Sequence, residues 1–160
     1  MSIEKVKEYF KREGIPNRIL EFDVSSATVE LAAKAVGIEP CRIAKTMSFL
    51  IGEDAIVVVL AGDVKVDNKK YKETFHTKAK MINYEEVEYY TAHAPGGVCP
   101  FALKEGVKVY LDQSLCRFET VFPAAGSSNS AVEMTIKELR RYSHAEGFID
   151  ISKPMVENLV

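Results

Sequence analysis

The chain has 160 residues, of which 47% are hydrophobic and 28% are charged, and its formal net charge at pH 7 is −2. This length favours a single domain over residues 1–160 with room for one good pocket, and the composition excludes a disordered or fibrous protein. The weakly negative charge argues against a uniformly basic nucleic-acid coat, so a nucleic acid would have to meet a local basic patch.

Apolar periodicity and turn residues divide the chain into short helices and strands. Helices are expected over residues 3–13, from a cap at Ser25 or Ser26 to Val36, and over 68–75, 84–90 and 135–142. Strands are expected over residues 18–23, 42–51, 54–62, 107–112, 119–126, 131–135 and 147–152, with a hairpin turn at Gly52-Glu53. This pattern favours an α+β domain with a compact, mixed, barrel-like sheet and helices packed around it.

Targeting and metal-binding signals are weak in this sequence. The longest apolar run, residues 55–61, is far too short to span a bilayer, and the first residues mix both charge signs, as an amphipathic helix does. The three cysteines, Cys41, Cys99 and Cys116, lack a C-x-x-C spacing, which predicts reduced thiols and no zinc ribbon. We therefore expect a cytoplasmic protein that needs no metal or cofactor and has neither a membrane nor DNA as a partner.

The segment APGGVCPFALKEGV, residues 94–107, places two glycines and a cysteine between two prolines, directly after His93. A nucleophilic pair of Cys99 and His93 is one interpretation, but their spacing across two glycines predicts nothing about their distance. Neither a set of metal ligands nor a glycine-rich phosphate motif is present. What remains is a loop from Gly96 to Pro100 that either orients backbone groups toward a ligand or is an ordinary turn.

Two other features suggest a ligand site. Lys45 lies within the apolar run RIAKTMSFLI, where strand alternation puts it on one face with Ile43 and Met47. That position suits either a cation aimed into a cavity or an edge lysine whose stem reaches water. Later, Ser128 and Asn129 belong to the polar stretch GSSNS, which could bond a ligand or simply form a turn.

Three stretches taken together resemble the YbaK/prolyl-tRNA synthetase editing-domain family of aminoacyl-tRNA deacylases. They are ATVELAAKAVGIEPCRIAKTMSF, GGVCPFAL and VFPAAGSSNSAVEMTIKEL, and they extend over about residues 25–140. The resemblance implies a mixed β-barrel with packed helices, and hydrolysis of the ester that joins a wrong amino acid to tRNA. It also implies a freestanding, trans-acting enzyme, because a synthetase or anticodon-binding module does not fit within 160 residues.

The resemblance also implies roles for particular residues. Lys45 matches the family's functional lysine, and Gly96 and Pro100 belong to the loop that shapes its catalytic pocket. The residues implied to contact the substrate are Gly97, Val98, Cys99, Ser128 and Asn129. The family's pocket is regarded as acting by positioning, with water or a group of the substrate attacking the ester, and without a metal or an enzyme nucleophile.

The resemblance narrows the substrate without fixing it. Synthetases reject smaller amino acids poorly, so a second site that hydrolyses the misfits is needed. Cysteine or alanine attached to the tRNA for proline are the implied substrates, and serine or threonine are less favoured candidates. Prolyl-tRNA synthetase is an optional partner. A different functional class is also consistent with the sequence: a module without catalytic activity that docks on a synthetase or senses an amino acid.

A mischarged tRNA partner requires positive charge, and the most basic run is VKVDNKKYKETFHTKAK, residues 64–80. Within it we expect Lys69, Lys70 and Lys72 to contact tRNA phosphates, which would give salt-dependent and sequence-tolerant binding. The alternative is a solvated helix face, since lysines are mostly exposed in any case.

Overall fold

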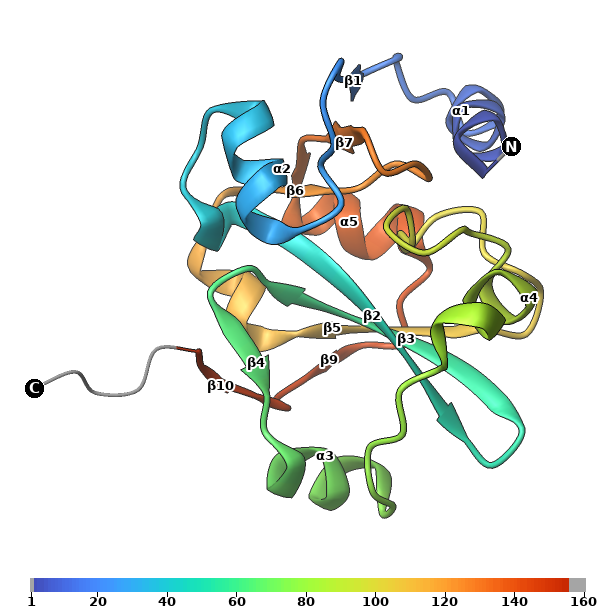
Figure 1. Ribbon diagram of the computed structural model, residues 1–160, viewed down its shortest axis with the longest axis vertical. Coiled ribbons are helices and arrows are strands. Elements are labelled where there is room, and N and C mark those ends of the chain that lie inside the picture. The colour runs from blue at the N-terminus through green and yellow to red at the C-terminus, as the bar shows by residue number, and fades with distance from the viewer. Residues whose placement is uncertain (1, 156–160) are drawn as a thin grey trace, which may run out of the picture.

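The structure, a computed structural model, describes residues 2–155 and consists of short helices around a curved sheet (Figure 1). Its α-helices are α1 (Ser2–Arg12), α2 (Val29–Val36), α3 (Asn68–Phe75), α4 (Val87–Thr91) and α5 (Ile136–Ser143). Its strands are β1 (Ile19–Glu21), β2 (Ile43–Ile51), β3 (Asp54–Ala61), β4 (Val64–Val66), β5 (Lys108–Asp112), β6 (Thr120–Pro123), β7 (Ser130–Val132), β8 (Met134–Thr135), β9 (Phe148–Ile149) and β10 (Ser152–Pro154). Single 3-10 turns lie at η1 (Pro40–Arg42), η2 (Tyr84–Glu86) and η3 (Gln113–Arg117).

The main sheet of the described residues has six strands in the order β8-β6-β2-β3-β5-β9. Strands β2 and β3 form the expected antiparallel hairpin, in which Ile51 lies opposite Asp54 and Gly52 turns with φ +64°. Strand β6 runs parallel to β2, and β5 runs parallel to β3. Two smaller antiparallel pairs, β1 with β7 and β4 with β10, extend this framework. The prediction of an α+β domain with a mixed, curled sheet is confirmed.

The core lies on both faces of β3, in which every residue from 55 to 61 is buried. Helix α1 contributes Ile3, Val6 and Phe10, which recur at helical spacing and face inward. The Phe10 ring meets Phe101 edge to face, with ring centroids 5.1 Å apart. This contact fixes the downstream end of the glycine loop, residues 96–100, against α1.

Helix α2 begins two or three residues later than expected. Its N-cap is Thr28, whose hydroxyl oxygen accepts a hydrogen bond from the Leu31 amide at 3.2 Å, so the prediction of Ser25 or Ser26 as the cap is wrong. The Ser26 hydroxyl is instead engaged with the backbone of the 126–130 loop. Helix α2 ends at Gly37 as expected, in the left-handed conformation.

The strand expected over residues 147–152 is two strands. Strand β9 pairs with β5, whereas β10 pairs with β4, a strand that the sequence did not indicate. Between them, the buried carboxylate of Asp112 accepts hydrogen bonds from the Ile151 amide at 2.8 Å and the Ser152 hydroxyl at 2.7 Å. A side chain therefore replaces the strand partner at the break. The expected strand 131–135 is similarly divided, because β7 pairs with β1 and β8 with β6.

Three of the helices mark the two ends of the molecule, and α4 and α5 lie between them (Figure 1). Helices α1 and α2 and the pair β1–β7 lie at one end of the long axis, and α3 lies at the other (Figure 1). Within residues 2–155, no helix is long and apolar enough to cross a membrane.

Candidate active site

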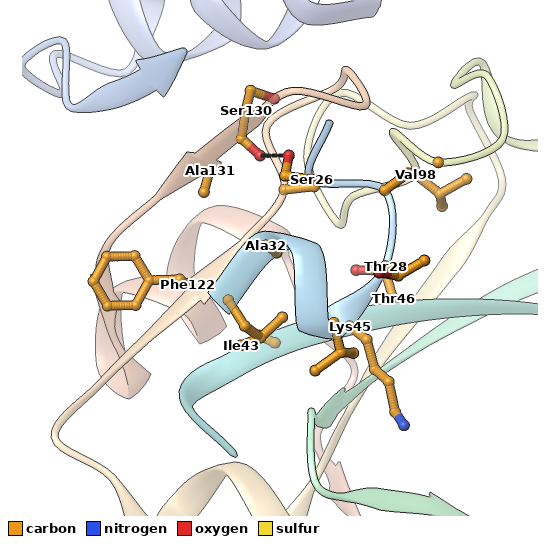
Figure 2. Close-up of a pocket in the computed structure, with 15 residues that line it drawn as sticks. Ser26, Thr28, Ala32, Ile43, Lys45, Thr46, Val98, Phe122, Ser130 and Ala131 are labelled. Atoms are coloured by element: carbon orange, nitrogen blue, oxygen red, sulfur yellow. Dashed lines mark hydrogen bonds between the residues drawn. The ribbon is translucent and has the colours of Figure 1, made fainter. Parts of the chain in front are cut away.

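A cavity of about 310 Å³ opens between α2, the beginning of β2 and two loops (Figure 2). Most of its lining side chains are small or apolar, and apart from Lys45 the polar ones carry hydroxyl groups. The lining residues are Ser26, Ala27, Thr28, Val29, Ala32, Ile43, Ala44, Lys45, Thr46, Gly96, Val98, Phe122, Ala124, Ser130 and Ala131. A cavity of this size and lining suits a small, uncharged group.

One wall of the cavity is the segment that enters α2, and backbone hydrogen bonds hold it in place. The amide of Phe22 donates to the Asn129 carbonyl at 2.8 Å, and the Asn129 side-chain amide donates back to Phe22 at 2.9 Å. Four residues on, the Ser26 amide donates to the Ser128 carbonyl at 2.6 Å, and the Ser26 hydroxyl reaches the Ser130 carbonyl (Figure 2). Ser128 and Asn129 therefore support this wall from outside, and neither is among the residues that line the cavity.

The two loops indicated by the sequence meet beside this wall. Gly96 has φ +88°, a conformation that favours glycine, and a Cβ there would lie 3.3 Å from the Ala27 Cβ and 3.4 Å from the Ser128 Cβ. A Cβ on Gly97 would come within 2.9 Å of the Ser127 backbone. Glycine is thus required at 97 because backbone packs directly against backbone, whereas at 96 the positive φ favours it.

The side chain of His93 contacts the end of the glycine loop. This side chain is fully buried, and its Nε2 lies 2.7 Å from the carbonyl oxygen of Phe101 and 3.5 Å from the Cys99 sulfur. The 2.7 Å contact assigns the ring proton to Nε2, since a carbonyl can only accept. An Nε2 that donates to Phe101 has no lone pair with which to take a proton from Cys99.

Burial keeps both groups neutral. It lowers the pKa of His93 and raises the pKa of the Cys99 thiol to about 12, so a thiolate is disfavoured at neutral pH. The structure brings Cys99 and His93 together, which the spacing could not indicate, but in a form suited to packing. Of the loop residues, Gly96 and Val98 line the cavity, whereas Pro100 lines a separate surface hollow beside Tyr9.

Lys45 lies at the edge of the cavity, and its side chain points away from Ser26 and Ser130 (Figure 2). Its ammonium group donates to the Val64 carbonyl of β4 and approaches the Met155 sulfur at 3.8 Å. Partial burial lowers the pKa of Lys45, and the nearby carboxylates of Asp63 and Glu30 act in the opposite direction. The ammonium group of Lys45 is therefore close to the cavity, but the backbone carbonyl of Val64 holds it at the edge.

Several lining residues were not singled out by the sequence. Among them, Thr46 follows Lys45, and its hydroxyl oxygen is buried without a hydrogen-bond partner in the described part of the chain. Such a group is costly unless something completes it. Thr28, Phe122 and Ser130 come from three other segments, and only the tertiary fold brings them together. The one sequence signal was their position within the stretches that carry the family resemblance.

The cavity offers positioning groups rather than a covalent catalyst. Among the described residues that line it, there is no cysteine, histidine, aspartate or glutamate. Within residues 2–155, no three such side chains form a group that could hold a metal ion. Hydroxyls, backbone groups and one lysine are what this site can present to a substrate.

The three lysines expected to bind tRNA lie on α3, at the far end of the molecule from α2 (Figure 1). Lys69 and Lys72 are exposed and line a surface hollow. Lys70 instead bonds the Asp150 carboxylate at 3.1 Å and the Ser152 carbonyl at 2.7 Å, which ties α3 to β10.

Comparisons with known proteins agree with this geometry. Residues 24–142 match the family described as the aminoacyl-tRNA editing domain. The chain is 49% identical over 154 residues to the uncharacterized protein YwhH of Bacillus subtilis (strain 168), covering 96% of this chain and 98% of that one. It is also 30% identical over 88 residues to proline–tRNA ligase of Bacillus cytotoxicus, a match that covers 54% of this chain and 16% of the ligase.

A solved structure shows the same fold over the whole domain. It is described as a candidate trans-editing enzyme for prolyl tRNA synthetase, with a TM-score of 0.86 at 27% identity, covering 95% of this chain and 97% of that one. The family match spans all four stretches that form the cavity. This chain therefore belongs to the aminoacyl-tRNA editing domain family.

Proposed function

We propose that this protein is a freestanding deacylase that hydrolyses mischarged tRNA in trans, with cysteine or alanine esterified to the tRNA for proline as its substrates. The observation that carries this proposal is the cavity of about 310 Å³, whose apolar and hydroxyl-bearing walls suit a small, uncharged amino-acid side chain. Similarity to proline–tRNA ligases and to the trans-editing structure supports the choice of tRNA.

The reaction requires water to attack the carbonyl carbon of the ester between the amino acid and the terminal ribose. The carbon–oxygen bond to the ribose then breaks, and the products are a free amino acid and a tRNA with a free hydroxyl. Because the lining residues include no histidine or carboxylate that could activate a hydroxyl as a nucleophile, rate acceleration would come from positioning the ester and stabilising charge on its oxygen. The tRNA's own neighbouring hydroxyl can assist the attack.

Particular residues would share this task. The backbone at Gly96 and the small side chains around it allow close approach of the ester, and Val98 with Phe122 would contact the amino-acid side chain. Lys45 would leave the Val64 carbonyl and bind phosphate or hydroxyl oxygens at the tRNA end, since an ammonium on a flexible stem can turn to a new acceptor. Gly97, Cys99, Pro100, Ser128 and Asn129 would contribute by shaping the walls.

The decisive experiment is a panel of tRNAs charged with cysteine, alanine, serine, threonine or proline and incubated with the purified protein. We expect rapid release of a small amino acid from mischarged tRNA for proline and no release of proline from the correctly charged tRNA. Adding prolyl-tRNA synthetase tests whether that partner increases the rate. If no ester in the panel is hydrolysed while tRNA or a free amino acid still binds, the chain is a binding or sensing module instead.

A further inference from the structure

A second hollow, of about 410 Å³, lies beside α3 and is lined by Asn68, Lys69, Lys72, Lys78 and Ala79. All three lysines are exposed, and none forms an ion pair with another residue in the range 2–155. Glu73 is the one acidic residue of α3 itself. Three ammonium groups around one hollow repel one another unless an anion lies among them.

A further lysine lies on the strand pair that leads into α3. Strands β4 and β10 are antiparallel, and their register places Lys153 directly opposite Lys65. Lys153 is exposed, so its ammonium group is accessible to an anionic partner.

The strand pair β4–β10 also reaches Lys45 at the edge of the active-site cavity. The Lys45 ammonium bonds the Val64 carbonyl, the residue before Lys65, and approaches Met155, which lies two residues beyond Lys153. In the other direction, β4 leads through the N-cap Asp67 directly into α3. A strand of three residues spans about 10 Å and a helix of eight about 12 Å, enough for several consecutive phosphates.

Two carboxylates on this face form ion pairs. Asp63 bonds Arg117 at 2.9 Å, and Asp150 bonds Lys70 at 3.1 Å. Asp67 accepts the Lys69 amide at 2.9 Å as the cap of α3 but keeps its charge, which lies near Lys153 and Lys70. Because the lysines outnumber Asp67 and Glu73, the face keeps a local excess of positive charge although the whole chain has a net charge of −2.

We propose that these side chains form a phosphate-binding track that carries the tRNA backbone from the hollow beside α3 to the cavity. The track consists of Lys69, Lys72 and Lys78 at its outer end, Lys153 in the middle and Lys45 at the cavity. It rests on the proposed function, which supplies the tRNA. Lys70 is not part of it, because its ammonium group holds α3 to β10.

The test is the affinity for an uncharged transcript of the tRNA for proline, measured by fluorescence anisotropy at several salt concentrations. The triple variant Lys69→Gln/Lys72→Gln/Lys78→Gln should bind about tenfold more weakly near 0.1 M salt, and the slope of log K against log salt should decrease by about 2 to 3. Its matched control is Lys5→Gln/Lys11→Gln/Lys137→Gln, with the same change of charge at exposed lysines of α1 and α5. The control should bind almost as the parent does.

Hydrolysis separates the track from the proposed function. An aminoacyl-adenosine ester lacks the tRNA phosphates, so the triple variant should hydrolyse it at the parent rate while its KM for charged tRNA rises. Equal affinities and slopes in the triple variant and the control would overturn the track, whatever the deacylation rate. A parent protein that hydrolyses no charged tRNA but shows the expected difference in binding would keep the track and remove the deacylase proposal.

Discussion

The imidazole of His93 lies 3.5 Å from the sulfur of Cys99, inside a region where both side chains are fully buried. Contact of this kind is found in cysteine nucleophiles, but here Nε2 also lies 2.7 Å from the Phe101 carbonyl. The pair therefore stabilises the glycine loop instead of generating a thiolate.

Cys99→Ala is expected to retain most of the deacylation activity. The variant loses a buried sulfur, which should lower the free energy of unfolding by about 1 kcal/mol, without removing a reacting group. Steady-state hydrolysis of mischarged tRNA and urea unfolding measure the two effects. Loss of all activity in a folded variant, or an aminoacyl thioester trapped on Cys99, would restore the nucleophile.

The buried imidazole also predicts how stability depends on pH. Burial lowers the pKa of His93 below its ordinary value of 6.5, so below that pH the unfolded chain binds a proton that the folded chain does not. The free energy of unfolding should therefore decrease as the pH falls below 6.5, by at most about 1.4 kcal/mol per pH unit from this group.

His93→Gln provides the comparison for that pH dependence. The variant should be less stable than the parent at pH 7.5, because the bond to Phe101 is weakened, and its stability should change less between pH 7.5 and 5.5. Urea unfolding at both pH values measures the difference. Parallel pH profiles in parent and variant would show that His93 does not titrate as its burial predicts.

Gly96→Val is expected to reduce deacylation much more than stability. The residue has φ +88°, which costs a branched residue about 1 to 2 kcal/mol, and the new side chain would enter the cavity wall. Gly106→Val is the matched control, because Gly106 has φ +93° with nothing within 4 Å of its Cβ position and does not line the cavity.

By thermal unfolding, Gly106→Val should show the cost of the positive φ alone, and Gly96→Val should lose somewhat more stability because its Cβ would crowd Ala27 and Ser128. Only Gly96→Val should lose activity in single-turnover assays. Unchanged kinetics in folded Gly96→Val would make the loop an ordinary turn.

Lys45→Ala is expected to fold normally, and its rate of deacylation should fall by about 100-fold or more. A loss of this size is typical when one group that stabilises charge in the transition state is removed. Its free energy of unfolding should change by no more than about 1 kcal/mol, because losing the partly buried cation offsets the loss of its packed stem. Lys45→Arg would keep the charge but misplace it. Single-turnover hydrolysis of mischarged tRNA is the measurement.

Lys108→Ala serves as the control for that variant, since this exposed lysine lies at the start of β5 outside the cavity. Rates like those of the parent in Lys45→Ala would remove the lysine from the site. An adduct trapped by borohydride in the parent would contradict its noncovalent role.

Local patterns in the sequence were sufficient for most of the secondary structure. The β2–β3 hairpin follows from two apolar runs around Gly52, and α3 and α5 follow from apolar periodicity with clear ends. Strand β4 gave no such signal, because its three residues are a strand only through pairing with β10 much later in the chain. The cap of α2 was misplaced for a related reason: the hydroxyl of Ser26 has a long-range partner that no local rule contains.

By itself the sequence determined the family, the α+β class and three of the stretches that form the cavity, because short motifs keep their order and spacing along the chain. Which side chains enter the cavity was decided only by the tertiary structure. Gly96 and Val98 line it, while Cys99 points into the core beside His93 and Asn129 bonds Phe22 behind the wall. The reason is physical: a loop residue's direction depends on backbone dihedrals and on partners far away in sequence, and neither is encoded by the spacing of its neighbours.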